Sequence, residues 1–435
     1  MLQSHNQVTR ILLIKLSALG DVIQTLPTLE ALRTAFPMAE ISWLAEEAAA
    51  PILSHHPALD TLLISRRSAW LAAARSWRTL PTAWRECRQL IRLLREAHYD
   101  IVLDLQGLLK SALWTMLARS PRKIGFAGTR EYSYLALSER LPPYDLEEHA
   151  VRRYLRLAEY LGAAANPSRF RLALPVAAGQ HLQALWTKPD GPLIVMHPGT
   201  RWPSKHWPAA SFAALADALR QEYGAKIVFT GSAADQPLIA RLRAAMQTPA
   251  LDLSGQTDLH DLARLFYHAD AAVTPDTGPM HLAAAVGTPV AAIFGPTAPW
   301  RTGPYGRQHQ VIRRAAACSP CRQRHCPDPF CLTDLPVADV LTAVKTLLNQ
   351  GPGLMQRSLH RQVIHGQEVD IIEHLATAPE TARGYENSPG ISGGVAKKRG
   401  QGAVTIFLLA AHRPLPTYRE VFAWFAGIKP KSPSS

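Results

Sequence analysis

Short apolar runs alternate with stretches of helical spacing along most of this chain. The runs predict buried strands in two sets, residues 11–16, 41–44 and 101–105, then residues 193–196, 227–230, 271–274 and 290–294. Helical spacing is found over residues 22–36, 212–223 and 337–348. Because strands that alternate with helices form parallel sheets, the pattern predicts two α/β domains joined near residues 163–192. In such sheets, ligands bind at the loops that follow the strands.

The expected domain boundaries follow from this pattern. A first domain is expected over residues 1–175, a second over 176–350, and an extension that we expect to be poorly ordered over 351–435. Gly, Ser and Lys are frequent in residues 387–402, which is typical of a linker. Removal of residues 352–435 is expected to leave the activity of the two domains intact.

The charge balance adds a clue about partners. The 435 residues carry a formal net charge of +13, which favours an anionic partner, either nucleic acid, an anionic membrane surface or a phosphorylated substrate. The alternative is that the charge serves only to keep the protein soluble. No apolar stretch approaches the roughly 18 residues of a membrane span. The early apolar run is broken by Lys15, so no secretory signal is expected and the predicted location is the cytosol.

The first candidate for chemistry is the turn from Lys15 to Asp21. It places small residues and one carboxylate where a strand gives way to a helix, a position that attracts negative charge. Asp21 is either a structural helix cap, since Asp is a favoured N-cap, or a carboxylate held for catalysis. The turn is not G-x-G-x-x-G, so it gives no support for a dinucleotide site.

The second candidate is the sequence from Pro275 to His281. A strand ends, Gly278 permits close approach of a ligand, and a helix begins near Pro279. Free amides and the helix dipole make such a start an anion site that suits a diphosphate. An ordinary capped helix is the alternative.

The loop from His197 to Trp207 follows another strand. Lys205 could neutralise a phosphate, or the loop could be a solvated basic segment. After the next strand, Asp235 could bond a ribose hydroxyl or cap the following helix.

Two further segments stand out. Cys318, Cys321, Cys326 and Cys331 lie close enough in sequence to hold a structural zinc ion, although free thiols in a surface loop are the favoured interpretation. Residues 66–95 hold eight arginines against one acid, with tryptophans at seven-residue intervals. That composition suits an anionic bilayer surface, or a solvated face with core tryptophans, and Pro81 is expected to break any single helix.

The order of these motifs resembles that of the lipopolysaccharide heptosyltransferases, glycosyltransferase family 9. The resemblance covers roughly residues 9–348. It is carried by the opening run from Ile11 to Pro27 and by Asp104-Leu-Gln-Gly-Leu-Leu-Lys110, His197-Pro-Gly-Thr200, Lys205-His-Trp-Pro208, Asp276-Thr-Gly-Pro-Met-His281 and Phe294-Gly-Pro-Thr297. The opening motif and Gln-Gly-Leu-Leu-Lys favour a family member that adds the first heptose.

The resemblance implies the GT-B architecture, an α/β fold of two Rossmann-like domains whose parallel sheets face a central cleft. It implies an inverting enzyme that moves heptose from ADP-heptose to the Kdo–lipid A inner core of lipopolysaccharide, with no catalytic metal and no cofactor. The expected location is cytoplasmic, peripheral on the inner membrane, with no nucleic-acid partner.

The family's site residues carry over by position. The resemblance implies that Asp21 is the general base and that Lys205 contacts the donor phosphates. Donor contacts are implied for Thr200, Ser232, Asp235, Asp276, Thr277, Gly278 and His281. Acceptor contacts are predicted for Ser17, Gly20, Gln106 and Lys110.

Three alternatives stay open. The charge and the cysteines suggest a zinc-containing nucleic-acid binder, but no recognised nucleic-acid motif is present. Tandem α/β domains suggest a nicotinamide-dependent oxidoreductase, but the absence of G-x-G-x-x-G from the first turn is evidence against it. A family member with another acceptor or nucleotide-sugar donor is the third.

Overall fold

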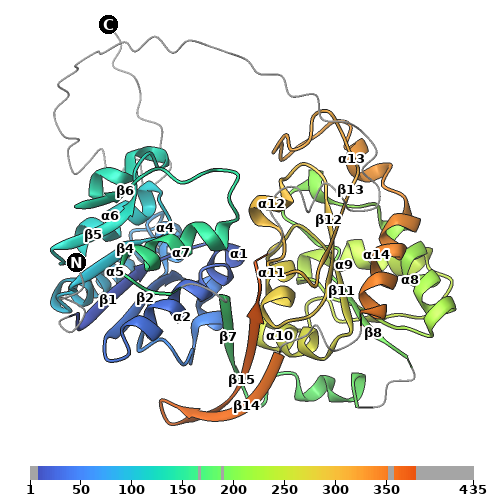
Figure 1. Ribbon diagram of the computed structural model, residues 1–435, viewed down its shortest axis with the longest axis horizontal. Coiled ribbons are helices and arrows are strands. Elements are labelled where there is room, and N and C mark those ends of the chain that lie inside the picture. Colours follow the sequence, from blue (N-terminus) through green and yellow to red (C-terminus); the bar gives the residue numbers. More distant parts are fainter. Residues whose placement is uncertain (1–7, 165–167, 188–190, 351–356, 379–435) are drawn as a thin grey trace, which may run out of the picture. The chain divides into compact units, whose positions relative to one another are not determined.

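The computed structural model describes residues 8–164, 168–187, 191–350 and 357–378 (Figure 1). Residues 66–90 form a unit of their own, and the two α/β domains belong to the other unit. The segment predicted as a linker, residues 387–402, lies outside the described residues.

The first domain is a six-stranded sheet in the order β3-β2-β1-β4-β5-β6, with every pair of neighbours parallel. Its strands are β1 Arg10–Ile14, β2 Glu40–Glu46, β3 Thr61–Ser65, β4 Ile101–Asp104, β5 Arg122–Phe126 and β6 Glu139–Leu141. Its α-helices outside residues 66–96 are α1 Leu19–Ile23, α2 Leu26–Ala35, α3 Ala50–Leu53, α6 Leu109–Leu117 and α7 Ala150–Tyr160.

The second domain repeats this topology, with strand order β10-β9-β8-β11-β12-β13 and parallel pairing throughout. Its strands are β8 Leu193–Met196, β9 Lys226–Phe229, β10 Leu251–Asp252, β11 Ala271–Pro275, β12 Val290–Phe294 and β13 Gln310–Arg313. Its α-helices are α8 Ala209–Tyr223, α9 Gln236–Ala245, α10 Leu259–His268, α11 Gly278–Ala285, α12 Pro299–Thr302, α13 Phe330–Thr333 and α14 Val337–Asn349.

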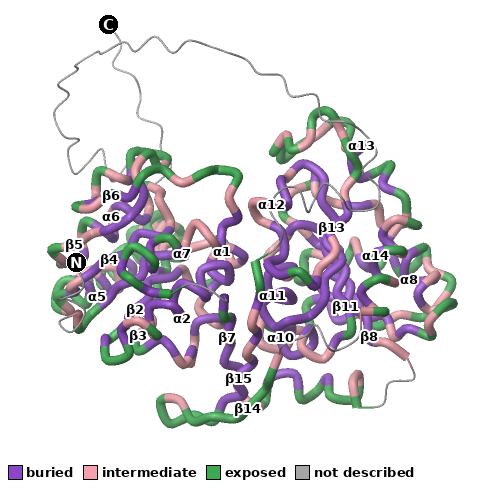
Figure 2. The backbone as a smooth tube through the Cα atoms, viewed as in Figure 1, coloured by how far each residue is buried: buried purple, intermediate pink, exposed green. Residues whose placement is uncertain are grey.

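The two sheets confirm the predicted fold class. Each sheet follows the 3-2-1-4-5-6 order of a Rossmann fold, in which the direction of strand addition reverses beside the domain's first strand. These reversals lie between β1 and β4 and between β8 and β11, so the loops after those four strands are the expected ligand sites. The central strands β4, β8, β11 and β12 are buried at every position, as Figure 2 shows for β11, which explains their apolar runs.

The helix predicted over residues 22–36 is instead two helices, α1 and α2, separated at Gln24 and Thr25. Pro27 is the second residue of α2, where its missing N–H leaves no hydrogen bond unmade. Because of this break, Asp21 lies in the five-residue helix α1, which follows the loop after β1.

The extension after residue 351 is not wholly irregular, and this corrects the sequence prediction. β14 Arg357–Ile364 and β15 Gln367–Ala376 form an antiparallel hairpin, and β15 pairs along eight residues with β7 Ser168–Pro175, the strand that joins the two domains. The two-residue turn uses His365 and Gly366, both with positive φ, as a tight hairpin requires. The β-branched residues Val369, Ile371 and Ile372 were the available signal for this strand.

Charged contacts tie this third sheet to both domains. Arg171 on β7 reaches Glu30 on α2, with 2.9 Å between Nε and Oε1. Asp370 on β15 accepts from Arg264 on α10 at 2.8 Å, and both side chains are buried. The hairpin therefore braces the strand that connects the domains.

The hairpin is expected to be required for stability. Val369, Ile371 and Ile372 are each at most 1% exposed, and burial of one such side chain contributes about 1.5–3 kcal/mol. Truncation after residue 350 should therefore lower the melting temperature markedly, whereas truncation after residue 378 should leave it unchanged. Ile371→Ala in the full chain should cost about 2–5 kcal/mol in a denaturant titration. Equal melting temperatures for the two truncations would mean that the hairpin adds nothing, and the earlier expectation for residues 352–435 would stand.

The unit of residues 66–90 contains α4 Arg67–Ala73 and the start of α5 Leu80–Glu96. The predicted break at Pro81 is confirmed, because that residue is the second of α5. Trp70 donates to Glu86 at 2.8 Å, whereas Trp77 and Trp84 are 80% and 48% exposed. At least two of the tryptophans are therefore not core residues.

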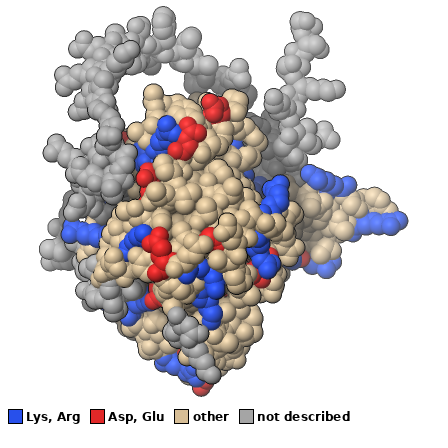
Figure 3. Space-filling view, turned by 90° about the vertical axis from the view of Figure 1, so that its right-hand side faces the viewer, with Lys and Arg blue, Asp and Glu red and all other residues tan. Residues whose placement is uncertain are grey.

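Charges of both signs lie on one face of the second domain (Figure 3). On the face that carries α8 and α14, Lys and Arg are interspersed with Asp and Glu, and Lys345 pairs with Glu222 at 2.5 Å (Figure 3). Within the described ranges, no helix combines the length and apolar character that crossing a bilayer requires.

Candidate active site

Asp21 lies at the third position of α1, directly after the β1 loop. One carboxylate oxygen, Oδ2, accepts the backbone N–H of Ala18 at 3.2 Å, and the other, Oδ1, accepts from the Tyr154 hydroxyl at 3.2 Å. Ala18, not Asp21, is the N-cap residue. The carboxylate is therefore fixed at the helix start by two donors, one of them a side chain from α7.

Lys15 lies beneath this carboxylate and is 2% exposed. Its ammonium donates to the Tyr154 hydroxyl at 2.8 Å and to the carbonyl of Leu105 at 3.1 Å. Burial lowers the pKa of Lys15 to about 8, and the nearby Asp21 and Asp104 carboxylates oppose that shift. Sequence reasoning assigned no role to Lys15 or Tyr154. A lysine directly after a buried apolar run was a signal for the first, and no sequence pattern points to the second.

The predicted acceptor residues Ser17, Gln106 and Lys110 are brought together at the reversal between β1 and β4. The side-chain oxygen of Gln106 accepts the backbone N–H groups of Leu16 and Ser17, both at 3.1 Å. Lys110 donates to the Ser17 hydroxyl and to Glu46 at 3.3 Å. Gln106 thus holds the β1 loop in place, and its contact with an acceptor stays a prediction.

Lys205 and Asp276 meet at the corresponding reversal of the second domain. The Lys205 ammonium lies 2.6 Å from Asp276 Oδ2 and 4.5 Å from the centre of the Trp202 ring. Asp276 directly follows β11, and Thr277 is the N-cap of α11 without a side-chain capping bond. A cation and the start of a helix therefore face one place, which is the arrangement that binds diphosphate.

The start of α1 packs against the start of α11. A methyl group added at Gly20 would lie 2.4 Å from the His281 ring, and one added at Gly278 would lie 3.2 Å from Leu19. Burial lowers the pKa of His281, while the Asp276 and Asp21 carboxylates oppose that shift. The predicted base and the predicted diphosphate site thus converge, and only glycine fits at position 20 in this arrangement.

The remaining predicted donor residues lie after β8 and β9. Ser232 donates to Asp235 through its hydroxyl at 2.6 Å and through its amide at 2.8 Å, so Asp235 acts as a local cap in this structure. The Asp235 carboxylate also lies against Gly199. The carbonyl of Thr200 contacts His206 at 2.9 Å. Whether Asp235 also contacts a ribose stays a prediction.

The cysteine segment shows no assembled metal site. All five cysteines are free thiols, and across the described ranges no group of three or more His, Cys, Asp or Glu residues could hold a metal ion. Burial, with the other three cysteines of the segment as smaller contributions, raises the pKa of the Cys331 thiol. Both interpretations of this segment, free thiols and structural zinc, stay predictions.

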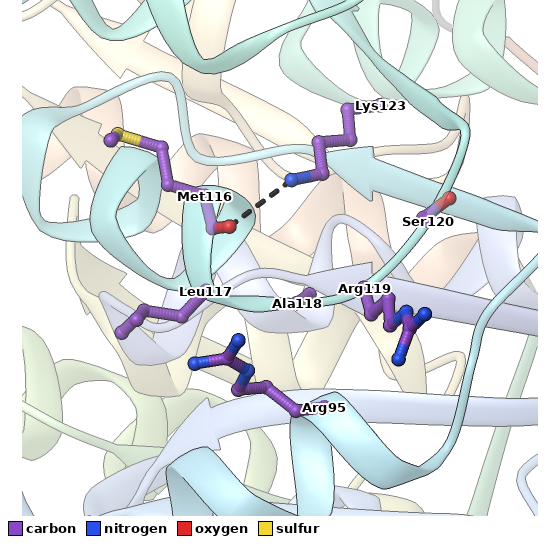
Figure 4. Close-up of a pocket in the computed structure, with 7 residues that line it drawn as sticks. All are labelled: Arg95, Met116, Leu117, Ala118, Arg119, Ser120 and Lys123. Carbon is purple, nitrogen blue, oxygen red and sulfur yellow. Dashed lines mark hydrogen bonds between the residues drawn. The ribbon is translucent and has the colours of Figure 1, made fainter.

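A surface hollow of about 370 Å³ lies elsewhere on the first domain (Figure 4). Its lining residues are Arg95, Met116, Leu117, Ala118, Arg119, Ser120 and Lys123. Lys123 closes one side by donating to the carbonyl of Met116 at 3.1 Å. None of the predicted site residues lines this hollow, so it is separate from the candidate active site.

The sequence is similar to a known protein family and to individual relatives. Residues 87–330 match the family described as Glycosyltransferase family 9 (heptosyltransferase). Lipopolysaccharide heptosyltransferase 1 of Pseudomonas aeruginosa is 33% identical over 369 residues, covering 78% of this chain and 98% of that protein. Lipopolysaccharide heptosyltransferase 2 of Salmonella typhimurium is 30% identical over 320 residues, covering 70% of this chain and 88% of that protein.

Solved structures give the same picture. An E. coli heptosyltransferase with ADP is similar with a TM-score of 0.62 and 26% identity, covering 78% of this chain and all of that one. The E. coli ADP-heptose heptosyltransferase II is similar with a TM-score of 0.61 and 27% identity, covering 79% and 99% of the two chains.

Proposed function

Because this chain belongs to glycosyltransferase family 9, the heptosyltransferase family, we propose that it transfers heptose from ADP-heptose to the Kdo-containing inner core of lipopolysaccharide. The observation that supports this most is the convergence of Asp21 with Lys205, Asp276 and the start of α11. A transferase needs a proton acceptor and a site for the leaving diphosphate within reach of one sugar carbon. The close approach of Gly20 to His281 brings the elements that carry them together.

The proposed step is a single displacement with inversion. The acceptor hydroxyl oxygen forms a bond to the anomeric carbon of heptose while the bond from that carbon to the ADP phosphate oxygen breaks. The hydroxyl proton passes to Asp21, and ADP leaves with the bonding electron pair. Lys205 and the amides at the start of α11 supply the positive potential that stabilises the departing diphosphate. This charge supply makes a catalytic metal ion unnecessary in the proposed mechanism.

The acceptor is proposed to be the Kdo–lipid A inner core that receives the first heptose. Two observations support this acceptor. The heptosyltransferase 1 of Pseudomonas aeruginosa matches over 98% of its length, and the opening motif also favours addition of the first heptose. Addition of the second heptose is the alternative, since heptosyltransferase 2 relatives match at 30% identity.

A peripheral location on the cytoplasmic face of the inner membrane is part of the proposal. Arg85 and Arg88 are exposed at a spacing of three residues in the part of α5 that belongs to the unit of residues 66–90, so they share one helix face. An arginine face and exposed tryptophans suit an anionic bilayer surface, where a lipid-linked acceptor would be presented.

A donor screen tests the proposal. ADP should raise the melting temperature, because a ligand at 100 times its Kd stabilises the folded state by about 2.7 kcal/mol. UDP, GDP and NAD at the same concentration should raise it much less. Transfer from ADP-heptose should then occur to Kdo–lipid A but not to an acceptor that already carries the first heptose. A larger shift with NAD or UDP than with ADP would contradict the proposed donor, and transfer only to the heptosylated acceptor would establish the alternative.

A further inference from the structure

The proposed base rests on a buried hydrogen-bonded chain. It runs from the Lys15 ammonium to the Tyr154 hydroxyl at 2.8 Å and from that hydroxyl to Asp21 Oδ1 at 3.2 Å. The Lys15 ammonium also lies 4.2 Å from the centre of the Tyr154 ring. The chain links β1, α7 and α1, so its geometry is set by the first domain itself.

The direction of each hydrogen bond is forced by chemistry. A protonated lysine has no lone pair, so its ammonium must donate and the tyrosine oxygen must accept. The tyrosine proton is then left for the Asp21 carboxylate. A donor that is itself polarised by a cation makes a stronger hydrogen bond, particularly where the surroundings exclude water.

We propose that Lys15 and Tyr154 are positioning residues that hold the Asp21 carboxylate correctly oriented for taking the acceptor proton. This inference rests on the proposed function, in which Asp21 is the base. The Tyr154 hydroxyl fixes Oδ1 and the Ala18 amide fixes Oδ2, so the carboxylate plane cannot rotate. A carboxylate has about four lone-pair sites, and these two donors leave room for the acceptor hydroxyl.

A purely structural role is the competing interpretation. The Lys15 ammonium also donates to the Leu105 carbonyl at 3.1 Å, which ties the β1 loop to the end of β4. If this were its whole purpose, loss of the Tyr154 hydroxyl would change stability and leave the chemistry unaltered.

The charges around the chain define its pH range. The charged or titratable groups that interact electrostatically with Lys15 or hydrogen-bond to it are Asp21 on α1, Asp104 on β4, Lys110 on α6, and Arg153 and Tyr154 on α7. Asp21 itself also interacts electrostatically with Tyr154 and with His281 on α11. The pKa of Lys15 is lowered to about 8, chiefly by burial. The ammonium is therefore present below that pH and is lost as the pH rises through it, which would remove the polarising cation.

Tyr154→Phe tests the proposal with the loss of one oxygen atom. We expect kcat to fall by about 10–100-fold, as for loss of a hydrogen bond to a charged group, with the KM for ADP-heptose unchanged. A role in the fold alone would instead lower the melting temperature and leave the kcat of the folded enzyme unchanged. Tyr160→Phe is the matched control, because Tyr160 lies on the same helix, is 52% exposed and donates its hydroxyl to Glu139 at 3.2 Å instead of to Asp21.

Lys15→Met tests the other end of the chain. We expect the wild-type kcat profile to decline near pH 8 as the Lys15 ammonium titrates, and we expect the Lys15→Met profile to lack that decline. A kcat of Tyr154→Phe equal to that of the control Tyr160→Phe, whatever the change in melting temperature, would overturn the proposal. If Asp21→Asn abolishes transfer while Tyr154→Phe behaves like wild type, this inference fails and the proposed function stands. If Asp21→Asn retains transfer, the proposed base itself is wrong.

Discussion

Asp21→Asn is expected to lower kcat by about 10²–10⁴-fold, the usual contribution of a general base, while folding and ADP binding stay intact. Asparagine has the same shape as aspartate and can still accept the Ala18 N–H, so the helix start should persist. It cannot take a proton from the acceptor hydroxyl. Initial rates of transfer, a melting curve and ADP calorimetry on the same preparation check the three parts of this expectation.

Asp339→Asn is the matched control for that variant. Asp339 occupies the third position of α14, the same helix position that Asp21 occupies in α1, but it lies away from the predicted site residues. An effect of helix capping or of the helix dipole alone should therefore be similar in both variants and well under about 1 kcal/mol. Near-normal turnover in Asp21→Asn would reduce Asp21 to a helix-start residue and remove the proposed base.

Lys205→Ala is expected to weaken ADP binding by about 10–100-fold, because a hydrogen bond to a charged group is worth about 1.5–3 kcal/mol. Turnover should fall as well, since the charge on the departing diphosphate grows during the step. The pair with Asp276 is mostly buried, the two side chains being 14% and 10% exposed, so some loss of stability should accompany the change. Calorimetry with ADP measures the first effect, and a melting curve measures the last.

Lys226→Ala serves as the control for Lys205→Ala. Lys226 lies in the same domain at the start of β9, and its ammonium donates to the carbonyl of Leu185 at 3.2 Å. Removing it changes the protein's charge by the same amount, so a general electrostatic effect on ADP would be common to both variants. Equal ADP affinity in Lys205→Ala and wild type would exclude Lys205 from the donor site.

The local sequence predicted much of the fold, because strand and helix starts depend on near neighbours. β8 and β12 lie where their apolar runs predicted, and α11 begins one residue from the expected position at Pro279. The two-domain Rossmann-like architecture was likewise predicted from the alternation of strands and helices and is confirmed. The helix over residues 22–36 was wrong in detail, since apolar spacing continues across the break between α1 and α2.

The sequence by itself indicated the turns and loops after strands that carry Asp21, Lys205 and Asp276, and so it offered these three residues as candidates. Only the tertiary structure decided which of them meet. Tyr154 lies 133 residues from Asp21, and Asp370 lies 106 residues from Arg264. Such contacts depend on the order of strands in a sheet and on how helices pack across it, and neither is encoded in the spacing of neighbouring apolar residues.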